Sequence, residues 1–327
     1  MLSQLIANNG FRKFLQRLLI FLLVLFALDF VVGSVLRKLY FTQKSGADYE
    51  TIYAIEKSNE EVMVFGSSRA RNHYHPEAFE KELGLSFYNA GRNGNFILYS
   101  NAVAQAVLKR HQPRIVILDV VGHEFEYYAP NYEKLSVLLP FYRNHPEIRS
   151  TVNLRGPFEK LKLGFQVYPF NSMLLSVGLG NTEFYNKKDP VIKGYSPINR
   201  ELTEQPIVDT VNLHYEIDSV QAKSYEEFIV ACKQAGVQLY IICSPYFNKL
   251  PVRDKSIVLA EQIAEQHGVP FWDHSQDPEF SWNPKNFYDV RHLNEPASLR
   301  FSKKIAEKIK ASQQSGDTDS QPSESGN

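Results

Sequence analysis

Three short segments of the chain carry side chains that could act together on an ester or another acyl bond. Ser67 and Ser68 directly follow the apolar run "EVMVFG" at residues 61–66. Glycines and asparagines fill "NAGRNGN" at residues 89–95, and "DVRH" at residues 289–292 places an aspartate shortly before a histidine. A serine hydroxyl attacks a carbonyl only when a base takes its proton, and histidine titrates near neutrality. An aspartate beside that histidine can fix its tautomer and stabilise the imidazolium.

Each motif taken alone is weak evidence for catalysis. A glycine followed by two serines is a common turn sequence, and an isolated D-x-x-H is usually a helix-capping aspartate with a surface histidine. Their combination is informative when all three segments follow strands of one sheet. Glycines at loop tips let backbone N–H groups approach an oxyanion, and asparagine amides add donors. Ser68 stands at a strand-to-helix turn, where its own N–H is a candidate oxyanion donor.

An alternation of short apolar runs and helical patterns predicts the elements that position these segments. The expected strands are residues 61–66, 86–91, 114–120, 237–245 and 269–274, and the expected helices are residues 99–111, 224–236, 257–268 and 295–310. Such alternation predicts an α/β fold, a three-layer flavodoxin-like parallel sheet with helices on both faces. The carboxyl ends of parallel strands meet at one edge, where ligands bind.

Two stretches depart from this alternation. Residues 125–218, inside an expected domain at residues 61–311, are rich in Tyr, Phe, Asn and Pro. They predict an aromatic-rich insertion above the carboxyl ends of the strands, serving either as a lid or substrate groove or as a packing module. Residues 312–327 are polar and lack apolar periodicity, which predicts a disordered tail.

The N-terminal region predicts a single-pass membrane anchor. Residues 18–36 contain one formal charge, Asp29, and at about 1.5 Å per residue they match a hydrocarbon core of about 30 Å. No small-x-small cleavage site follows them. Basic residues flank both ends and barely decide the orientation. We expect residues 1–17 in the cytoplasm, a juxtamembrane linker at residues 37–60, Asp29 near the outer interface, and a periplasmic or extracellular domain.

Composition narrows the classes of ligand. The formal net charge is zero, which gives no electrostatic reason to expect nucleic acid as a partner. His73 and His75 form an H-x-H pair without an accompanying cysteine or acid cluster, so we expect no metal and no organic cofactor. Cys232 and Cys243 are interpreted as two buried thiols rather than a disulfide.

Three arginines lie close to the predicted site in sequence. Arg69 and Arg71 follow the two serines, and Arg92 lies within the glycine-rich segment. Guanidinium groups match carboxylates and phosphates, so these side chains are candidates for binding an anionic group of a surface polymer. The alternative is that they are ordinary solvated loop residues.

The three segments together resemble the SGNH, or GDSL-type, hydrolases. "FGSSRA", "NAGRNG" and "DVRHLN" are similar to the first, second and last sequence blocks of that superfamily, in matching order, over roughly residues 61–310. The residues after the last block resemble the membrane-anchored branch, which includes the D-alanine transfer protein of teichoic-acid synthesis and the alginate O-acetylation proteins.

This resemblance implies a role for each site residue. Ser68 matches the nucleophile, His292 the base and Asp289 the acid that orients the base. Gly94 matches the glycine whose N–H contacts the oxyanion, and Gly91 is an alternative.

The sequence departs from the family pattern in two places. Ser67 stands where the first block usually has aspartate, although serine there resembles the anchored branch. The third block usually ends in asparagine and aspartate, but residues 122–124 read Gly-His-Glu. The family's oxyanion asparagine is therefore not in its expected place, and Asn93, Asn95 or His123 are candidate substitutes.

The resemblance implies a membrane-anchored, serine-dependent acyl esterase or O-acyltransferase, most plausibly for acetyl, that acts on a cell-envelope polysaccharide. It also implies a membrane-bound O-acyltransferase as a partner. The alternatives are a catalytically inactive SGNH-fold protein that assembles a complex or binds polysaccharide, and a periplasmic lipase or thioesterase.

Overall fold

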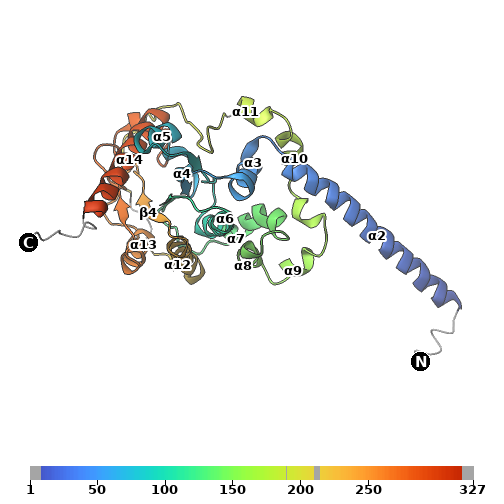
Figure 1. Cartoon of the computed structure of the whole chain (residues 1–327). Coiled ribbons are helices and arrows are strands. Elements are labelled where there is room, and N and C mark those ends of the chain that lie inside the picture. Colours follow the sequence, from blue (N-terminus) through green and yellow to red (C-terminus); the bar gives the residue numbers. More distant parts are fainter. Residues whose placement is uncertain (1–8, 189, 210–213, 319–327) are drawn as a thin grey trace, which may run out of the picture.

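The computed structural model describes residues 9–188, 190–209 and 214–318, and its central element is a five-stranded sheet (Figure 1). The strand order is β2-β1-β3-β4-β5, and every neighbouring pair is parallel. The strands are β1 (Val62–Phe65), β2 (Phe87–Asn89), β3 (Ile115–Asp119), β4 (Gln238–Cys243) and β5 (Phe271–Asp273). The α/β class and the parallel sheet predicted from the alternating pattern are confirmed.

Helices cover both faces of the sheet, which explains why its central strands are almost continuously apolar. Alternate residues of β1 and β3 enter two separate buried clusters, Met63, Phe65, Val116 and Leu118 on one face and Val62, Val64, Ile115 and Ile117 on the other. The first face packs against α6 (Ile97–Arg110), α12 (Ser219–Gln234) and α13 (Lys255–Gln266). The second packs against α4 (Ser68–His73), α5 (Pro76–Leu83) and α14 (Glu295–Thr318). Cys232 and Cys243 are buried free thiols.

The aromatic-rich insertion leaves the sheet and returns to it at one point. Glu126 and Ile217 form an antiparallel bridge, close to the boundaries expected from the sequence. Between them the structure has short helices and 3₁₀ turns: α7 (Ala129–Glu133), η2 (Lys134–Phe141), η3 (Pro146–Ile148), α8 (Arg149–Asn153), α9 (Glu159–Lys162), η4 (Tyr168–Phe170), α10 (Leu174–Gly180) and α11 (Phe184–Lys188). Leu138, Phe141 and Phe170 are buried in the same cluster as α6, so part of the insertion extends the core.

The N-terminal helix α2 (Asn9–Phe41) projects from the folded domain (Figure 1). Within the part of the chain that the structure describes, it is the one helix long and apolar enough to cross a membrane. Its most apolar 18-residue stretch has a mean hydropathy of 2.8, and 6% of that stretch is buried. Its C-terminal end leads into α3 (Gly46–Ile52) and the π-helix η1 (Tyr53–Lys57). Residues 37–60, expected to be a linker, are therefore largely helical, and Ile52 and Ile55 are buried in the domain core.

The last helix is longer than the sequence pattern indicates. It was expected to end near residue 310, yet α14 runs to Thr318. The Ser312 hydroxyl lies 3.0 Å from the Tyr240 hydroxyl, so the start of the predicted tail packs against β4. Residues 319–327, the remainder of that predicted tail, lie outside the described residues.

Candidate active site

Ser68 lies where β1 turns sharply into α4. Gly66 adopts a φ of 141°, and a Cβ at this position would lie 2.7 Å from the Asp119 carbonyl oxygen, so only glycine fits the turn. Ser67 caps α4, because its Oγ accepts a hydrogen bond from the Arg69 N–H at 3.3 Å. Ser68 is the first helical residue and is half-buried. The N–H of a first helical residue has no acceptor within its own helix.

The serine, the histidine and the aspartate predicted from the sequence form one hydrogen-bonded series. The Oγ of Ser68 lies 2.8 Å from Nε2 of His292, although 224 positions separate them in the sequence. Nδ1 of His292 lies 2.9 Å from Oδ2 of Asp289. Nδ1–H can therefore donate to the carboxylate while Nε2 accepts from the serine hydroxyl, which is the tautomer that a general base needs.

The loop that carries His292 is closed on itself. Phe287 and Leu293 form an antiparallel bridge across it. Oδ1 of Asp289 accepts hydrogen bonds from the N–H groups of Arg291 (2.8 Å) and His292 (2.9 Å). Burial alone would raise the pKa of Asp289, but the hydrogen bonds from the His292 side chain and from these two N–H groups outweigh it, so the pKa lies below its ordinary value. The carboxylate is thus ionised at neutral pH.

His73 supports this loop from the interior. It is fully buried at the end of α4, and its Nε2 accepts a hydrogen bond from the Leu293 N–H at 2.9 Å. Its Nδ1 therefore carries the proton and donates to the Ser244 Oγ at 2.9 Å. Burial, and next the positive charge of Arg69, hold the pKa of His73 well below its ordinary value, so the ring is neutral. The H-x-H pattern in the sequence does not predict this supporting role of His73.

The three arginines proposed as anion-binding residues contact other protein groups. Arg69 is buried, donates to the Ser244 hydroxyl at 2.9 Å, and lies 3.7 Å from the centroid of the Tyr246 ring. Its guanidinium group thus faces the interior rather than a substrate.

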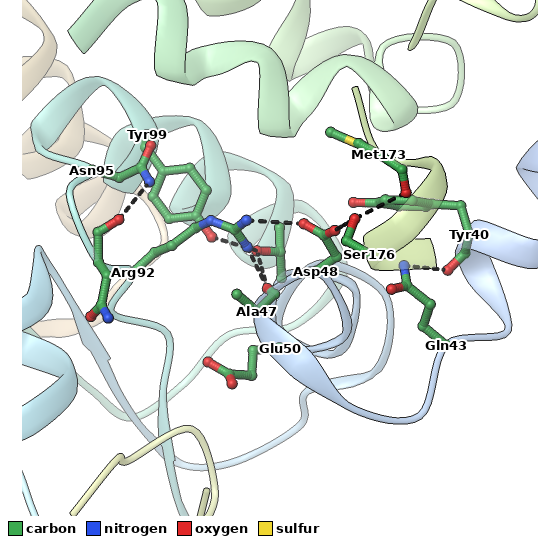
Figure 2. A network of polar contacts seen from close by, with 12 residues as sticks. Tyr40, Gln43, Ala47, Asp48, Glu50, Arg92, Asn95, Tyr99, Met173 and Ser176 are labelled. Atoms are coloured by element: carbon green, nitrogen blue, oxygen red, sulfur yellow. Dashed lines mark hydrogen bonds and ion pairs between the residues drawn. The ribbon is translucent and has the colours of Figure 1, made fainter. Parts of the chain in front are cut away.

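Arg71 and Arg92 form ion pairs with α3. Nε and Nη2 of Arg71 donate hydrogen bonds to the two carboxylate oxygens of Glu50, at 3.1 and 2.9 Å. Arg92 contacts Asp48 at 2.9 Å and also the Thr51 hydroxyl and the Ala47 carbonyl, as Figure 2 shows for the Asp48 pair. The juxtamembrane segment therefore supplies the carboxylates for two arginines next to the predicted site.

The glycine-rich segment is tied to the serine turn. The Arg92 N–H donates to the Gly66 carbonyl at 3.1 Å. The Gly91 N–H is engaged by Oδ1 of Asn89 at 3.0 Å, which makes Gly91 a poor oxyanion donor. Gly94 lies at the loop tip with a φ of 69°, where a side chain would be strained.

The candidate amide donors differ in their surroundings. Asn95 is buried, and its side-chain amide donates to the Asn93 carbonyl at 3.2 Å. The Asn93 side chain is exposed.

The unusual third block performs structural tasks. His123 has a φ of 61°, its N–H donates to Asp254 at 3.1 Å, and its Nδ1 lies 3.0 Å from Glu126. Glu124 is buried and accepts the N–H groups of Val121 (3.2 Å) and Ile97 (2.7 Å). Glu124 therefore fastens the start of α6 to the loop after β3, a role that the sequence pattern did not predict.

The sequence matches no protein-family model, and no curated protein matches it.

Proposed function

We propose that the protein is a serine-dependent acyl esterase or O-acyltransferase, anchored in a membrane by α2 and acting on a cell-envelope polysaccharide outside the cytoplasm. The observation that carries this proposal is the contact series from Ser68 to His292 to Asp289. A hydroxyl, an imidazole and a carboxylate in this order are the parts of a nucleophilic acyl-transfer site.

The reaction proceeds in two steps. His292 Nε2 takes the Ser68 proton as Oγ bonds to the acyl carbon, and the N–H groups of Ser68 and Gly94 stabilise the oxyanion. The C–O bond to the leaving alcohol then breaks, that alcohol leaves with the proton from Nε2, and the acyl group stays on Ser68. An acceptor hydroxyl, from water in hydrolysis or from a sugar in transfer, next loses its proton to His292 Nε2 as its oxygen bonds to the acyl carbon. The bond from that carbon to Ser68 Oγ then breaks, and Nε2 returns the proton to Oγ, so Ser68 is again a free hydroxyl.

The fold supports this location for a site. The order β2-β1-β3-β4-β5 is that of flavodoxin-like sheets, which bind ligands where successive connections leave in opposite directions. That point lies between β1 and β3, and Ser68 follows β1. With helices on both faces, we assign the domain to the three-layer SGNH architecture that its motifs resemble.

The polysaccharide substrate follows from the resemblance and is supported by the insertion. Tyr127 and Tyr128 lie a few residues after β3 and have 63% and 56% of their surfaces exposed. Exposed aromatic rings at the carboxyl edge of the sheet suit stacking on sugar rings. Acetyl is the acyl group that the family resemblance favours, and a membrane-bound O-acyltransferase is the partner that would deliver it.

A second candidate function is a catalytically inactive assembly or polysaccharide-binding protein. The observation that favours it is the third block, in which His123 is engaged by Glu126 and Asp254 instead of standing free as an oxyanion donor.

Labelling with a serine-directed fluorophosphonate, together with hydrolysis of p-nitrophenyl acetate, separates these functions. The full chain is tested in nanodiscs as wild type, Ser68→Ala and Ser67→Ala. Catalysis predicts labelling and ester cleavage that Ser68→Ala abolishes and Ser67→Ala retains, since Ser67 only caps α4. Unlabelled wild-type protein, with intact binding to envelope polysaccharide, would favour the inactive function.

A further inference from the structure

The insertion contacts the apolar part of α2, and Asp29 is the centre of that contact. Its carboxylate accepts hydrogen bonds from the N–H groups of Gln166 (2.7 Å) and Val167 (3.1 Å). One turn on, Gly33 lies so close to the insertion that a Cβ there would be 2.2 Å from the Gln166 Cβ. Residues 165–167 therefore lie directly against α2.

The same contact extends toward the N-terminus of α2. The rings of Phe26 and Phe165 are parallel, with centroids 6.2 Å apart. The insertion thus covers α2 at least from Phe26 to Gly33, and this is the stretch in which a membrane span would be expected.

The length of α2 sets where a bilayer can lie. Arg17 is the last basic residue before the apolar stretch, and Asp29 follows it by about 18 Å of helix at about 1.5 Å per residue. A hydrocarbon core of about 30 Å that begins at Arg17 therefore extends past Asp29, which differs from the expected position of Asp29 near the outer interface. It must extend toward Arg37, the next charged residue after Asp29. Residues 165–167 then lie at the depth of the hydrocarbon rather than in water.

The outer surface of this part of the insertion is suited to lipid. Five large apolar side chains of residues 158–175 are exposed, and the most exposed are Leu161 (70%) and Leu175 (76%). The others are Phe158, Phe165 and Leu174. An open groove of about 420 Å³ beside Asp29 is lined by Leu161, Phe165 and Tyr168 among others. Soluble surfaces rarely gather so many exposed large apolar side chains over so short a segment.

Several polar groups at this contact are compensated, as a location in lipid requires. Asp29 pairs with two backbone N–H groups that would otherwise be unsatisfied. Glu159 is buried and accepts from the Tyr168 hydroxyl at 2.8 Å and from the Lys162 Nζ at 2.9 Å. Lys160 is exposed and long enough to place its ammonium group among lipid phosphates.

We propose that residues 158–175 penetrate the apolar layer of the membrane beside α2, on the side that carries the folded domain, and that phospholipid acyl chains cover them. The segment fixes the domain against the bilayer at two places instead of one. This proposal rests on the membrane anchor of the proposed function and is independent of the chemistry of Ser68.

Depth-dependent quenching in nanodiscs of pure phosphatidylcholine tests the proposal, since no partner protein is present there. Single cysteines at L161C, F165C and L175C carry a polarity-sensitive fluorophore in the full chain. L28C in α2 is the reference for lipid, and V252C, which is apolar, 59% exposed and outside the segment, is the matched control. Cys232 and Cys243 are buried, and burial raises the pKa of the Cys232 thiol to about 12, so the label selects the new cysteines.

We expect probes at L161C and F165C to be quenched by nitroxide-bearing lipids to a degree comparable with L28C, and V252C to be quenched by aqueous iodide. Iodide quenching at L161C and F165C while L28C remains in lipid overturns the proposal. Iodide quenching at L28C overturns it as well, because α2 would then not span the bilayer. Fluorophosphonate labelling of Ser68 in the same samples reports separately on the serine chemistry.

A pair of variants at Asp29 tests the contact itself. Asp29→Asn retains one acceptor for the insertion N–H groups, whereas Asp29→Leu removes both. We expect the L161C and F165C probes to lose lipid quenching in the Asp29→Leu background and to keep most of it with Asp29→Asn. Equal quenching in both backgrounds would show that Asp29 does not hold the segment in the membrane.

Discussion

His73 and Leu293 join the two ends of the candidate site through a hydrogen bond from the Leu293 N–H to the His73 Nε2 at 2.9 Å. His73 ends the short helix that Ser68 begins, and Leu293 directly follows His292. The N-terminal end of α4 therefore contacts the histidine loop through Ser68 and His292, and its C-terminal end contacts the same loop through His73 and Leu293.

Replacing His73 by leucine is expected to disturb the geometry of His292. The Leu293 N–H would lose its acceptor in the core, at a cost of about 1–3 kcal/mol in unfolding free energy for a buried unsatisfied group, while the Ser244 hydroxyl would keep its contact with Arg69. Fluorophosphonate labelling of Ser68 should slow more than this loss of stability explains. Urea unfolding and labelling rates measure the two effects.

The matched control is His73→Gln, whose amide can accept from Leu293 and donate to Ser244. Labelling that recovers in this variant supports a positioning role. Equal labelling in His73→Leu and wild type would show that the loop holds His292 without this bond.

Asp289→Asn is expected to reduce ester cleavage by a large factor while the fold remains intact. An amide favours the wrong tautomer of His292 and cannot stabilise its cation, and such a change in a comparable triad costs roughly 10⁴-fold in rate. Turnover of p-nitrophenyl acetate, compared with thermal unfolding, measures the separation of activity from stability.

The chain contains a second aspartate–histidine pair of the same spacing that serves as control. Asp277 lies 2.8 Å from Nδ1 of His274 and also contacts Lys304. Asp277→Asn should alter stability and leave turnover unchanged. A comparable loss of activity in both variants would argue that the Asp289 effect is one of folding.

Glu124 predicts a fall in stability as the solution becomes alkaline. Burial raises its pKa to about 8 in the folded protein, despite the N–H groups of Val121 and Ile97 that lower it. Between the ordinary glutamate pKa and about 8, the folded protein therefore keeps a proton on Glu124 that the unfolded chain releases. This proton contributes fully to the free energy of unfolding below the ordinary glutamate pKa, and its contribution is lost as the pH rises toward 8. The slope approaches about 1.4 kcal/mol per pH unit within this window.

Denaturant unfolding of wild type and Glu124→Gln between pH 5 and pH 9 measures this contribution. The variant does not ionise and should lack the corresponding part of the decline. Parallel curves for the two proteins would mean that Glu124 has an ordinary pKa.

The Asp48–Arg92 pair is expected to contribute much more than a surface ion pair. Their side chains are 11% and 13% exposed, and removal of one partner from a buried pair typically costs roughly 3–5 kcal/mol. Asp48→Asn should therefore lower the urea midpoint strongly. It should also slow labelling of Ser68, since the Arg92 N–H contacts the turn that precedes it.

The exposed pair Lys303–Glu307, with side chains 58% and 55% exposed, provides the comparison. Glu307→Gln should change the unfolding free energy by less than about 1 kcal/mol. Similar losses in the two variants would contradict a special role for the Asp48 contact.

Local patterns predicted the elements of the sheet and the three polar segments at its edge. Apolar runs such as residues 61–66 end in polar or glycine residues, and these signals depend only on neighbouring residues. The Ser68–His292 contact followed because the carboxyl ends of parallel strands meet at one edge. Local sequence patterns, combined with the expected sheet, therefore predicted a contact between residues that lie far apart in the sequence.

The partners of the arginines were not predictable in the same way. Asp48 and Glu50 lie in a segment whose composition resembles a linker, and no local periodicity connects them to Arg92 or Arg71. The role of His73 was equally hidden, because an H-x-H sequence does not reveal that both histidines are buried or which groups they contact. Such contacts depend on tertiary packing. They give structural roles to residues that the sequence indicated as candidates for ligand binding.

The ion pairs of α3 also define how far the chain can be shortened from its N-terminus before the residues around Ser68 lose their contacts. A water-soluble fragment that starts after Ile52 would leave Arg71 and Arg92 without their counter-charges, next to the serine helix and the glycine-rich loop. Proteolytic release from the membrane therefore preserves this edge of the domain only when the cut falls on the α2 side of α3.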